Sequence, residues 1–254
     1  MMRMWIGAVG VACVVAVAGC LQAPPSMDEV DGAAGGSTIT HRLLTAGAGV
    51  ENRKDYATAA ISPEPDSLVT VALAIHRSSE VPDVGLTGGG IASWDPVATI
   101  SYNLEGATPL DRVAIFRGTS AAPGDGPIII TASETISNCQ WIVSQWSGVD
   151  VSGSNGAAAV EQSGSQSGES VAGLTVELAP FRRAGNAAYG VFGVVSKVPA
   201  VTPGGGFTVI DEQPSGENTP GDVFAEWAVG QPEVTAAWSG LSGGALAVEL
   251  ALAP

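Results

Sequence analysis

Short stretches rich in Val, Ile and Thr recur along the chain and alternate larger apolar residues with small or polar ones. In the clearest of them, SLVTVALAIH at 67–76, Val69, Val71, Leu73 and Ile75 occupy every second position. Clusters of Gly, Pro, Asp, Asn and Ser separate about a dozen such stretches, and no segment shows a capped 3.6-residue period. This pattern predicts an all-β fold: an antiparallel two-sheet β-sandwich, jelly-roll-like, with about a dozen strands.

Three longer stretches lack this alternation, and we expect them to be loops. They are 81–96, 151–169 and 198–206, all rich in Gly together with Ser, Ala or Pro. The longest is 151–169, which reads VSGSNGAAAVEQSGSQSGE. Loops of this length in compact domains are usually either functional or disordered, and the composition leaves both interpretations open.

The N-terminus has the layout of an export signal. Arg3 precedes a short apolar run from Ile6 to Val17, which is too short for a comfortable membrane span. The run ends in VAGC at 17–20, which resembles the bacterial lipobox. That resemblance implies that the thiol of Cys20 receives diacylglycerol, that cleavage occurs just before it, and that the new amino group is acylated too, with palmitate or a similar chain. The alternative is a plain cleaved signal in which the cysteine is incidental.

The expected organisation has three parts: a lipoprotein signal peptide at 1–19, a flexible tether at 20–37, and one β-sandwich domain at 38–254. The tether, LQAPPSMDEVDGAAGGS after the cysteine, has no periodicity. A lipidated Cys20 makes the membrane a partner. Leu21 stands where inner-membrane lipoproteins carry Asp, so the resemblance implies an exported protein at the outer membrane or cell surface.

A second resemblance covers about residues 60–254. The order DSLVTVALAIHR, WDPVATISYN, CQWIVSQWSGVD, AAYGVFGVV, GFTVIDEQ and a closing VTAAWSGLSGGALAVELALAP is similar to β-sandwich domains of secreted bacterial and phage-associated surface proteins. Its motifs are structural and bring no catalytic residues. The resemblance implies adhesion, carbohydrate contact or structural display.

Charge and cysteine content exclude several kinds of partner. With 25 acidic against 10 basic residues and a net charge of −15, the chain would be repelled by nucleic acids, which we exclude as partners. Cys13 lies in the export signal and Cys20 would carry lipid, so Cys139 remains alone and is expected to be a buried small hydrophobe. His41 and His76 are far apart without a neighbouring ligand, so we expect no metal site and no cofactor.

Catalytic motifs are weak. The run GLSGG at 240–244 formally matches a nucleophile elbow, but Ser242 lies between two expected strands and both histidines precede it, which favours a hairpin turn. Glycoside hydrolysis requires two carboxylates across a cleft. Glu226 and Glu249 each stand alone in an apolar stretch, and we interpret both as outward-facing charges.

Aromatic residues are the remaining candidates. Four tryptophans lie in expected strands and are interpreted as core or edge packing: Trp141, Trp146, Trp227 and Trp238. Trp94 lies on a loop beside Asp95, and we take these two as the candidate ligand-binding residues, against the alternative that Trp94 only covers the end of the sandwich. The sequence thus favours a non-enzymatic membrane-anchored surface module that binds carbohydrate or another envelope component. The alternatives are a structural or assembly subunit of a surface complex or coat, or a glycoside hydrolase with an unusual carboxylate pair.

Overall fold

The computed structural model describes residues 37–106, 108–195, 201–215 and 221–254. The expected signal peptide, Cys20 and the tether up to residue 36 lie outside the described residues. Ser37–Pro254 forms one compact unit. Apart from one 3₁₀ helix, η1 (Ser154–Ala159), the regular structure of its described residues is all strand. Among the described residues, no helix is long and apolar enough to cross a membrane.

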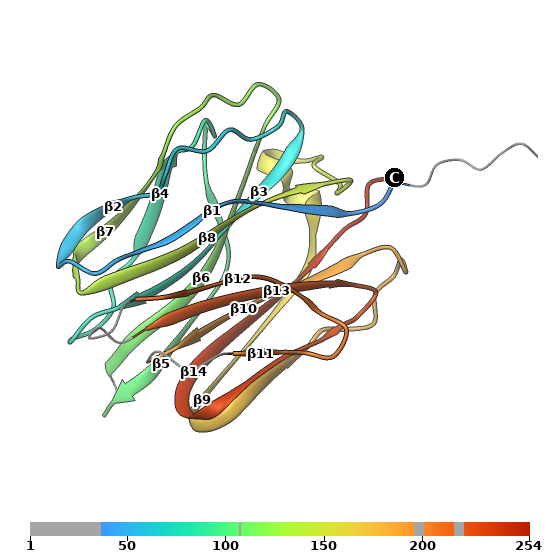
Figure 1. Ribbon diagram of the computed structural model, residues 1–254. Helices are drawn as coiled ribbons and strands as arrows, with labels where there is room; N and C mark the ends of the chain where they lie inside the picture. The colour runs from blue at the N-terminus through green and yellow to red at the C-terminus, as the bar shows by residue number, and fades with distance from the viewer. Residues whose placement is uncertain (1–36, 107, 196–200, 216–220) are drawn as a thin grey trace, which may run out of the picture. The chain divides into compact units, whose positions relative to one another are not determined.

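A five-stranded antiparallel sheet forms the middle layer, in the order β1-β8-β3-β6-β5 (Figure 1). Its strands are β1 (Thr40–Gly49), β3 (Ser67–His76), β5 (Asp95–Glu105), β6 (Thr108–Ser120) and β8 (Asn138–Ser147). The central strand β3 is buried on both faces along nearly its whole length. This sheet must therefore be covered on two sides.

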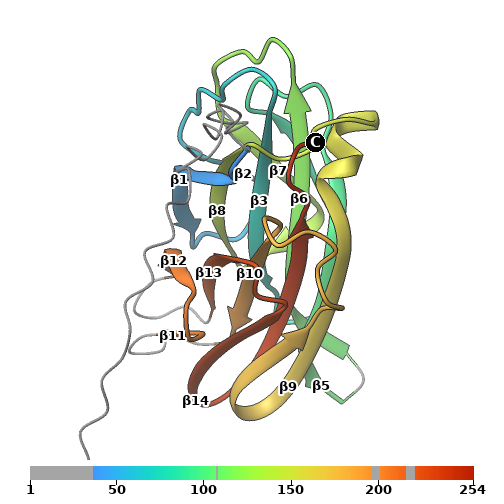
Figure 2. The same ribbon diagram turned by 90° about the vertical axis from the view of Figure 1, so that its right-hand side faces the viewer.

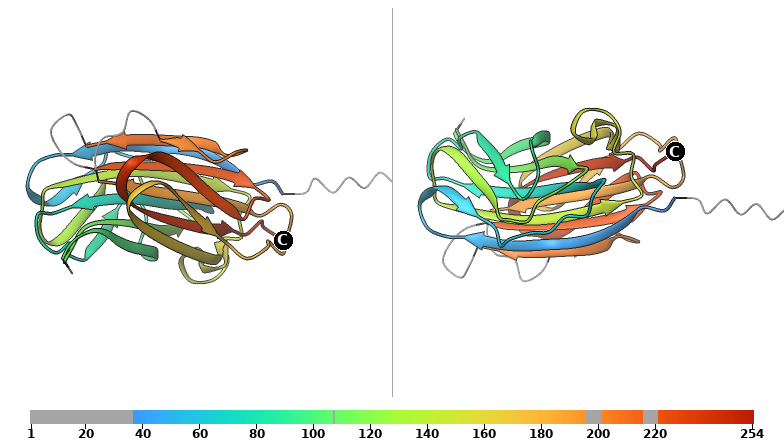
Figure 3. Two further views of the ribbon diagram at one scale, coloured as in Figure 1. Left: turned by 90° about the horizontal axis from the view of Figure 1, so that it is seen from below. Right: turned by 90° about the horizontal axis from the view of Figure 1, so that it is seen from above.

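A six-stranded antiparallel sheet covers one face. Its order is β11-β14-β10-β13-β12, with β9 pairing the other edge of β14. The strands are β9 (Val160–Glu177), β10 (Ala187–Val194), β11 (Thr202–Pro203), β12 (Thr208–Pro214), β13 (Asp222–Val229) and β14 (Glu233–Leu250). Strands β1 and β12 lie side by side along one side of the sandwich (Figure 3), and β5 and β9 along the other (Figure 2). The predicted antiparallel sandwich is confirmed.

A third sheet of three strands, β2 (Arg53–Ala57), β7 (Ile128–Ile136) and β4 (Val84–Gly88), covers the outer face of the middle layer in the order β2-β7-β4. Its apolar side chains pack with Val69, Val71 and Leu73 of β3, while Leu68 and Ala72 face the six-stranded sheet. The alternation in β3 therefore separates two apolar cores, where the sequence suggested an apolar and a polar face.

Several expectations about irregular segments are wrong. The expected loop 81–96 contains β4 and the first two residues of β5, and the described part of 198–206 contains β11. The stretch 151–169 is a loop only in part, because it contains η1 and the first half of β9. Ser242 does not lie in a hairpin turn; it belongs to the continuous strand β14, whose pairing with β9 shifts register beside it. Gly240 at φ +65° accommodates the bend there. Small residues thus allow β9 and β14 to curve so that Val234 and Trp238 pack over Phe192 of their own sheet.

Candidate functional site

A mainly apolar groove of about 480 Å³ opens between β4 and the strands β5 and β6. It exists because the three-stranded sheet is narrower than the sheet beneath it: β4 is its last strand, and the groove continues over β5. The apolar lining residues are Leu73, Ile75, Val84, Leu86, Trp94, Pro96, Ala98, Ala114 and Phe116. Gly85, Asp83, Thr99 and Arg112 complete the lining. A concave apolar surface with few polar groups is the usual character of a ligand site.

Trp94 lines this groove from the segment just before β5. Its indole N–H donates to the carbonyl oxygen of Gly88 at 3.2 Å, which fixes the half-buried ring against the end of β4. Gly118 of β6 allows this approach, since a Cβ there would lie 2.5 Å from Ile91 and 3.2 Å from the indole. Trp94, the tryptophan that the sequence analysis chose as a candidate, therefore lines the groove.

Asp95 does not join Trp94 in that cavity. It is the first residue of β5, directly opposite Arg117 of β6, and its carboxylate lies 3.6 Å from the Arg117 guanidinium. Neighbouring residues of a strand point to opposite faces, so adjacency in sequence separates these two side chains. Asp95 is an ion-pair partner and is absent from the groove lining.

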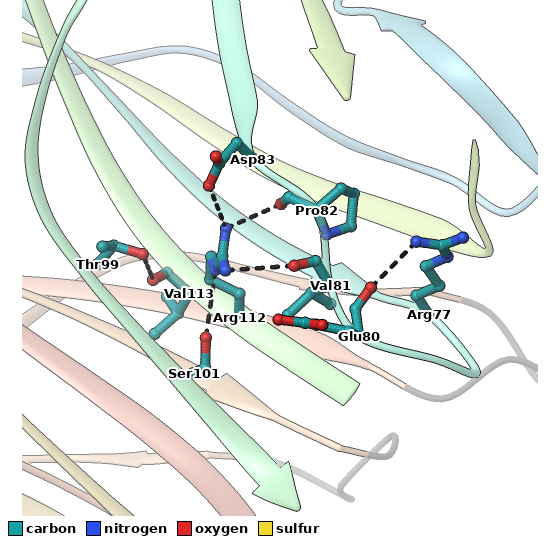
Figure 4. A network of polar contacts seen from close by, with 9 residues as sticks. All are labelled: Arg77, Glu80, Val81, Pro82, Asp83, Thr99, Ser101, Arg112 and Val113. Atoms are coloured by element: carbon teal, nitrogen blue, oxygen red, sulfur yellow. Dashed lines mark hydrogen bonds and ion pairs between the residues drawn. The ribbon is translucent and has the colours of Figure 1, made fainter. Parts of the chain in front are cut away.

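Arg112 of β6 is the groove residue that the sequence did not single out. Its guanidinium donates to the carbonyl oxygens of Pro82 at 2.8 Å and Val81 at 3.3 Å, and its Nε donates to Ser101 Oγ at 3.2 Å (Figure 4). It also lies 3.3 Å from an oxygen of Asp83, whose side chain is 99% exposed. Arg112 thereby fixes the segment that leads into β4. The available signal was a lone arginine in an apolar stretch, LDRVAIF at 110–116.

The two strand glutamates are buried, so the expectation that they face outward is wrong. Glu226 is 0% exposed; its Oε2 accepts the N–H of Gly204 at 3.1 Å and its Oε1 has no hydrogen-bond partner among the described residues. Burial raises the pKa of Glu226 to about 7. The six-stranded sheet is covered on this face too, by the curved ends of β9 and β14, which is why β13 carries no solvent-facing charge there.

Glu249 is held by two amides. Asn186 Nδ2 donates to its Oε1 at 2.6 Å and Gln162 Nε2 to its Oε2 at 2.5 Å. It lines a polar pocket of about 530 Å³ that Asp150, Glu161 and Arg182 also line, and Glu226 is not among the lining residues. Glu226 and Glu249 thus have different hydrogen-bond partners, and only Glu249 lines this pocket.

The remaining candidate groups have structural partners. His76 Nδ1 lies 2.9 Å from Asp111 Oδ1, and Asn103 Nδ2 donates to Asp111 Oδ2 at 2.5 Å. Burial lowers the pKa of His41 to about 4. Cys139 is fully buried and burial raises the pKa of its thiol, which leaves it unreactive. Within the described ranges, no group of three or more His, Cys, Asp or Glu side chains is placed to hold a metal ion.

The tryptophans of the strands behave as expected for packing residues. Trp141, Trp146 and Trp238 are buried, and Trp227 is half-buried against Trp146 at a ring separation of 5.8 Å. Trp94 is thus the one strand-flanking tryptophan of the described domain that lines the apolar groove.

Comparisons with known proteins add no relative: no protein-family model matches the chain, and no curated protein matches it.

Proposed function

We propose that this protein is a non-enzymatic binding module, held at a bacterial surface by a lipidated Cys20, and that its ligand binds in the Trp94 groove. The ligand is a carbohydrate or another component of the cell envelope. The observation that carries the proposal is the apolar groove with the indole of Trp94 fixed in its wall. A ring face beside an apolar floor suits a ligand with an apolar face, such as a sugar ring or a peptide side chain.

The polar lining of the groove supports binding over catalysis. The Thr99 hydroxyl donates to the carbonyl oxygen of Val113 at 3.3 Å, and Arg112 is engaged by the segment before β4. Asp83 is the one carboxylate among the lining residues, and it is almost fully exposed. A general acid–base pair needs two titratable groups poised at the reacting atoms, and the groove offers one.

Trp94→Ala is expected to weaken binding of the envelope ligand by about tenfold or more, because aromatic anchors in apolar sites contribute disproportionately to affinity. The measurement is retention of the protein on immobilised polysaccharides, peptidoglycan and envelope extracts. Leu43→Ala is the matched control, since Leu43 is an apolar side chain on β1, 40% exposed and absent from the groove lining. Equal binding by both variants would remove Trp94 from the site.

Cys20→Ser is expected to abolish membrane partitioning and incorporation of labelled palmitate, because a thiol is the nucleophile needed for the lipid linkage. Cys139→Ser is the internal control, since Cys139 is buried in the β-domain and should leave lipidation unchanged. Membrane association of the Cys20→Ser variant at the wild-type level would contradict the anchor.

The alternative function is that of a structural subunit that contacts copies of itself. It predicts a mass that rises with concentration in light scattering, without binding to any envelope component. The net charge of −15 opposes close self-association at low ionic strength, which is why we place this alternative second.

A further inference from the structure

The edge of β4 that faces the groove has backbone groups without partners. β4 pairs with β7 in an antiparallel register in which Asp83 O accepts Ser133 N at 3.0 Å and Pro127 O accepts Gly89 N at 2.8 Å. Because hydrogen-bonded positions alternate along such a ladder, the odd-numbered residues between them bond to β7. The N–H and C=O groups of Val84 and Leu86 therefore point away from β7, and no described residue bonds them.

Within its five residues, β4 carries few of the usual protections of an edge strand, although it is short and Pro82 and Asp83 directly precede it. Natural edge strands carry charges, prolines or bulges that prevent pairing with another chain. Val84–Gly88 reads VGLTG, with no charge, no proline and no register shift in its pairing with β7. Its Leu86 side chain packs into the core below, so the edge is held rigidly beside the groove.

The space beside the edge suits a single extended strand. The groove has β4 as its wall and residues of β3, β5 and β6 as its floor. A strand added to β4 would become the fourth strand of the outer sheet. Its alternate side chains would then contact Phe116 and Ala98 on the floor, in the manner of β-strand addition. The floor of the groove extends beyond the edge of β4. This space suits one extended segment more readily than a second folded domain.

At one end of the groove, Arg112 has an N–H that an acidic group of the occupant could accept. The described contacts use four of the five N–H groups of Arg112, which leaves one N–H on Nη2. Its ion pair with the 99%-exposed Asp83 is of the weak surface kind. A carboxylate from the ligand would complete the guanidinium or replace Asp83 there.

We infer that the occupant of the Trp94 groove is an extended polypeptide segment of a partner protein, added to β4 as an edge strand. Its alternating apolar side chains fill the groove and an acidic group lies at its Arg112 end. This inference rests on the proposed binding role of the groove and names the class of ligand.

The test uses the full chain and short synthetic fluorescent peptides in which Val or Leu alternates with Thr and either Glu or Lys stands at one end. Wild-type protein should bind alternating peptides with Glu more tightly than those with Lys. Val84→Pro should weaken this binding by about tenfold or more relative to Val84→Ala, because proline removes the N–H that faces the ligand. Both variants keep the bonds to β7, because these bonds are made by the odd-numbered residues. Val84→Ala removes the two methyl groups and keeps the N–H, so it is the control for the loss of the valine side chain, whereas Val84→Pro also removes the N–H.

A second measurement does not depend on folding of the proline variant. N-methylation of the peptide at alternate residues should abolish binding to the wild-type protein, whereas methylation at the residues between them should not. Equal binding by the two Val84 variants, together with equal binding of all methylated peptides, would overturn strand addition.

The outcomes separate this inference from the proposed function. Binding of soluble oligosaccharides but not peptides, lost in Trp94→Ala and kept in Val84→Pro, would retain the groove as a site and overturn the peptide ligand. A concentration-dependent mass that Val84→Pro abolishes would identify a second copy as the occupant, and would also overturn it. If neither Trp94→Ala nor Val84→Pro changes peptide binding, the groove is neither the proposed binding site nor a site of strand addition.

Discussion

Glu226→Gln should stabilise the protein relative to the wild type by about 3 kcal/mol more at pH 8 than at pH 4. The carboxyl group is 0% exposed, one of its oxygens has no partner among the described residues, and burial raises its pKa from 4.5 to about 7. Ionisation inside the protein therefore carries a large desolvation cost that the neutral amide avoids.

The sign follows from the two pKa values of Glu226. Below pH 4.5 the carboxyl is protonated in the folded and the unfolded chain, and it adds no pH dependence. As the pH rises from 4.5 to about 7 the unfolded chain releases the proton and the folded chain keeps it, so the free energy of unfolding falls. Above about pH 7 both states are ionised and the loss is complete.

Urea unfolding of both proteins across this pH range measures the effect as a difference between two curves. The difference is needed because the other acidic residues of the chain contribute their own pH dependence. Glu134→Gln, an exposed glutamate on β7, is the control and should give a curve parallel to the wild type. A Glu226→Gln curve parallel to the wild type would show that Glu226 titrates as a solvated acid.

Trp146→Ala should lower the free energy of unfolding by about 3–5 kcal/mol. Trp146 is fully buried at the centre of the core between the two larger sheets. Its ring lies 4.8 Å from the ring of His41 and 5.1 Å from that of Tyr189, and its indole N–H donates to Thr70 Oγ1 at 2.9 Å. Truncation leaves a cavity among these rings and an unpaired buried hydroxyl.

Urea unfolding followed by far-ultraviolet circular dichroism measures this loss without relying on tryptophan fluorescence. Trp146→Phe keeps an aromatic ring but removes the donor to Thr70 and part of the ring volume, so its loss should be smaller than that of Trp146→Ala. It should lose about 1–3 kcal/mol. Leu43→Ala, at an exposed site, should change stability by less than about 0.5 kcal/mol. A loss for Trp146→Ala as small as that of the control would contradict the central packing role.

The candidate site could be predicted only in part. Trp94 stood out because a large aromatic residue beside a glycine-rich segment is unusual, and the structure places it at the groove. β4 did not stand out, because VGLTG is short and its two glycines have low strand propensity. Asp95 was selected by adjacency to Trp94 alone, and the pleat turns it toward Arg117. Arg112 gave almost no signal, since its partners Val81 and Pro82 are distant in sequence.

The sequence by itself determined that the described domain is all-β and antiparallel, because a two-residue alternation of apolar side chains is a local property of each strand. Which strand faces meet water was decided only by the tertiary structure. The same alternating stretch has one solvent-exposed face or none, depending on whether another layer covers it. Here β2, β7 and β4 cover β3, and the backbone at Gly204 lies against the buried Glu226. The groove has the same origin, since its width is the amount by which the outer sheet falls short of the sheet beneath it.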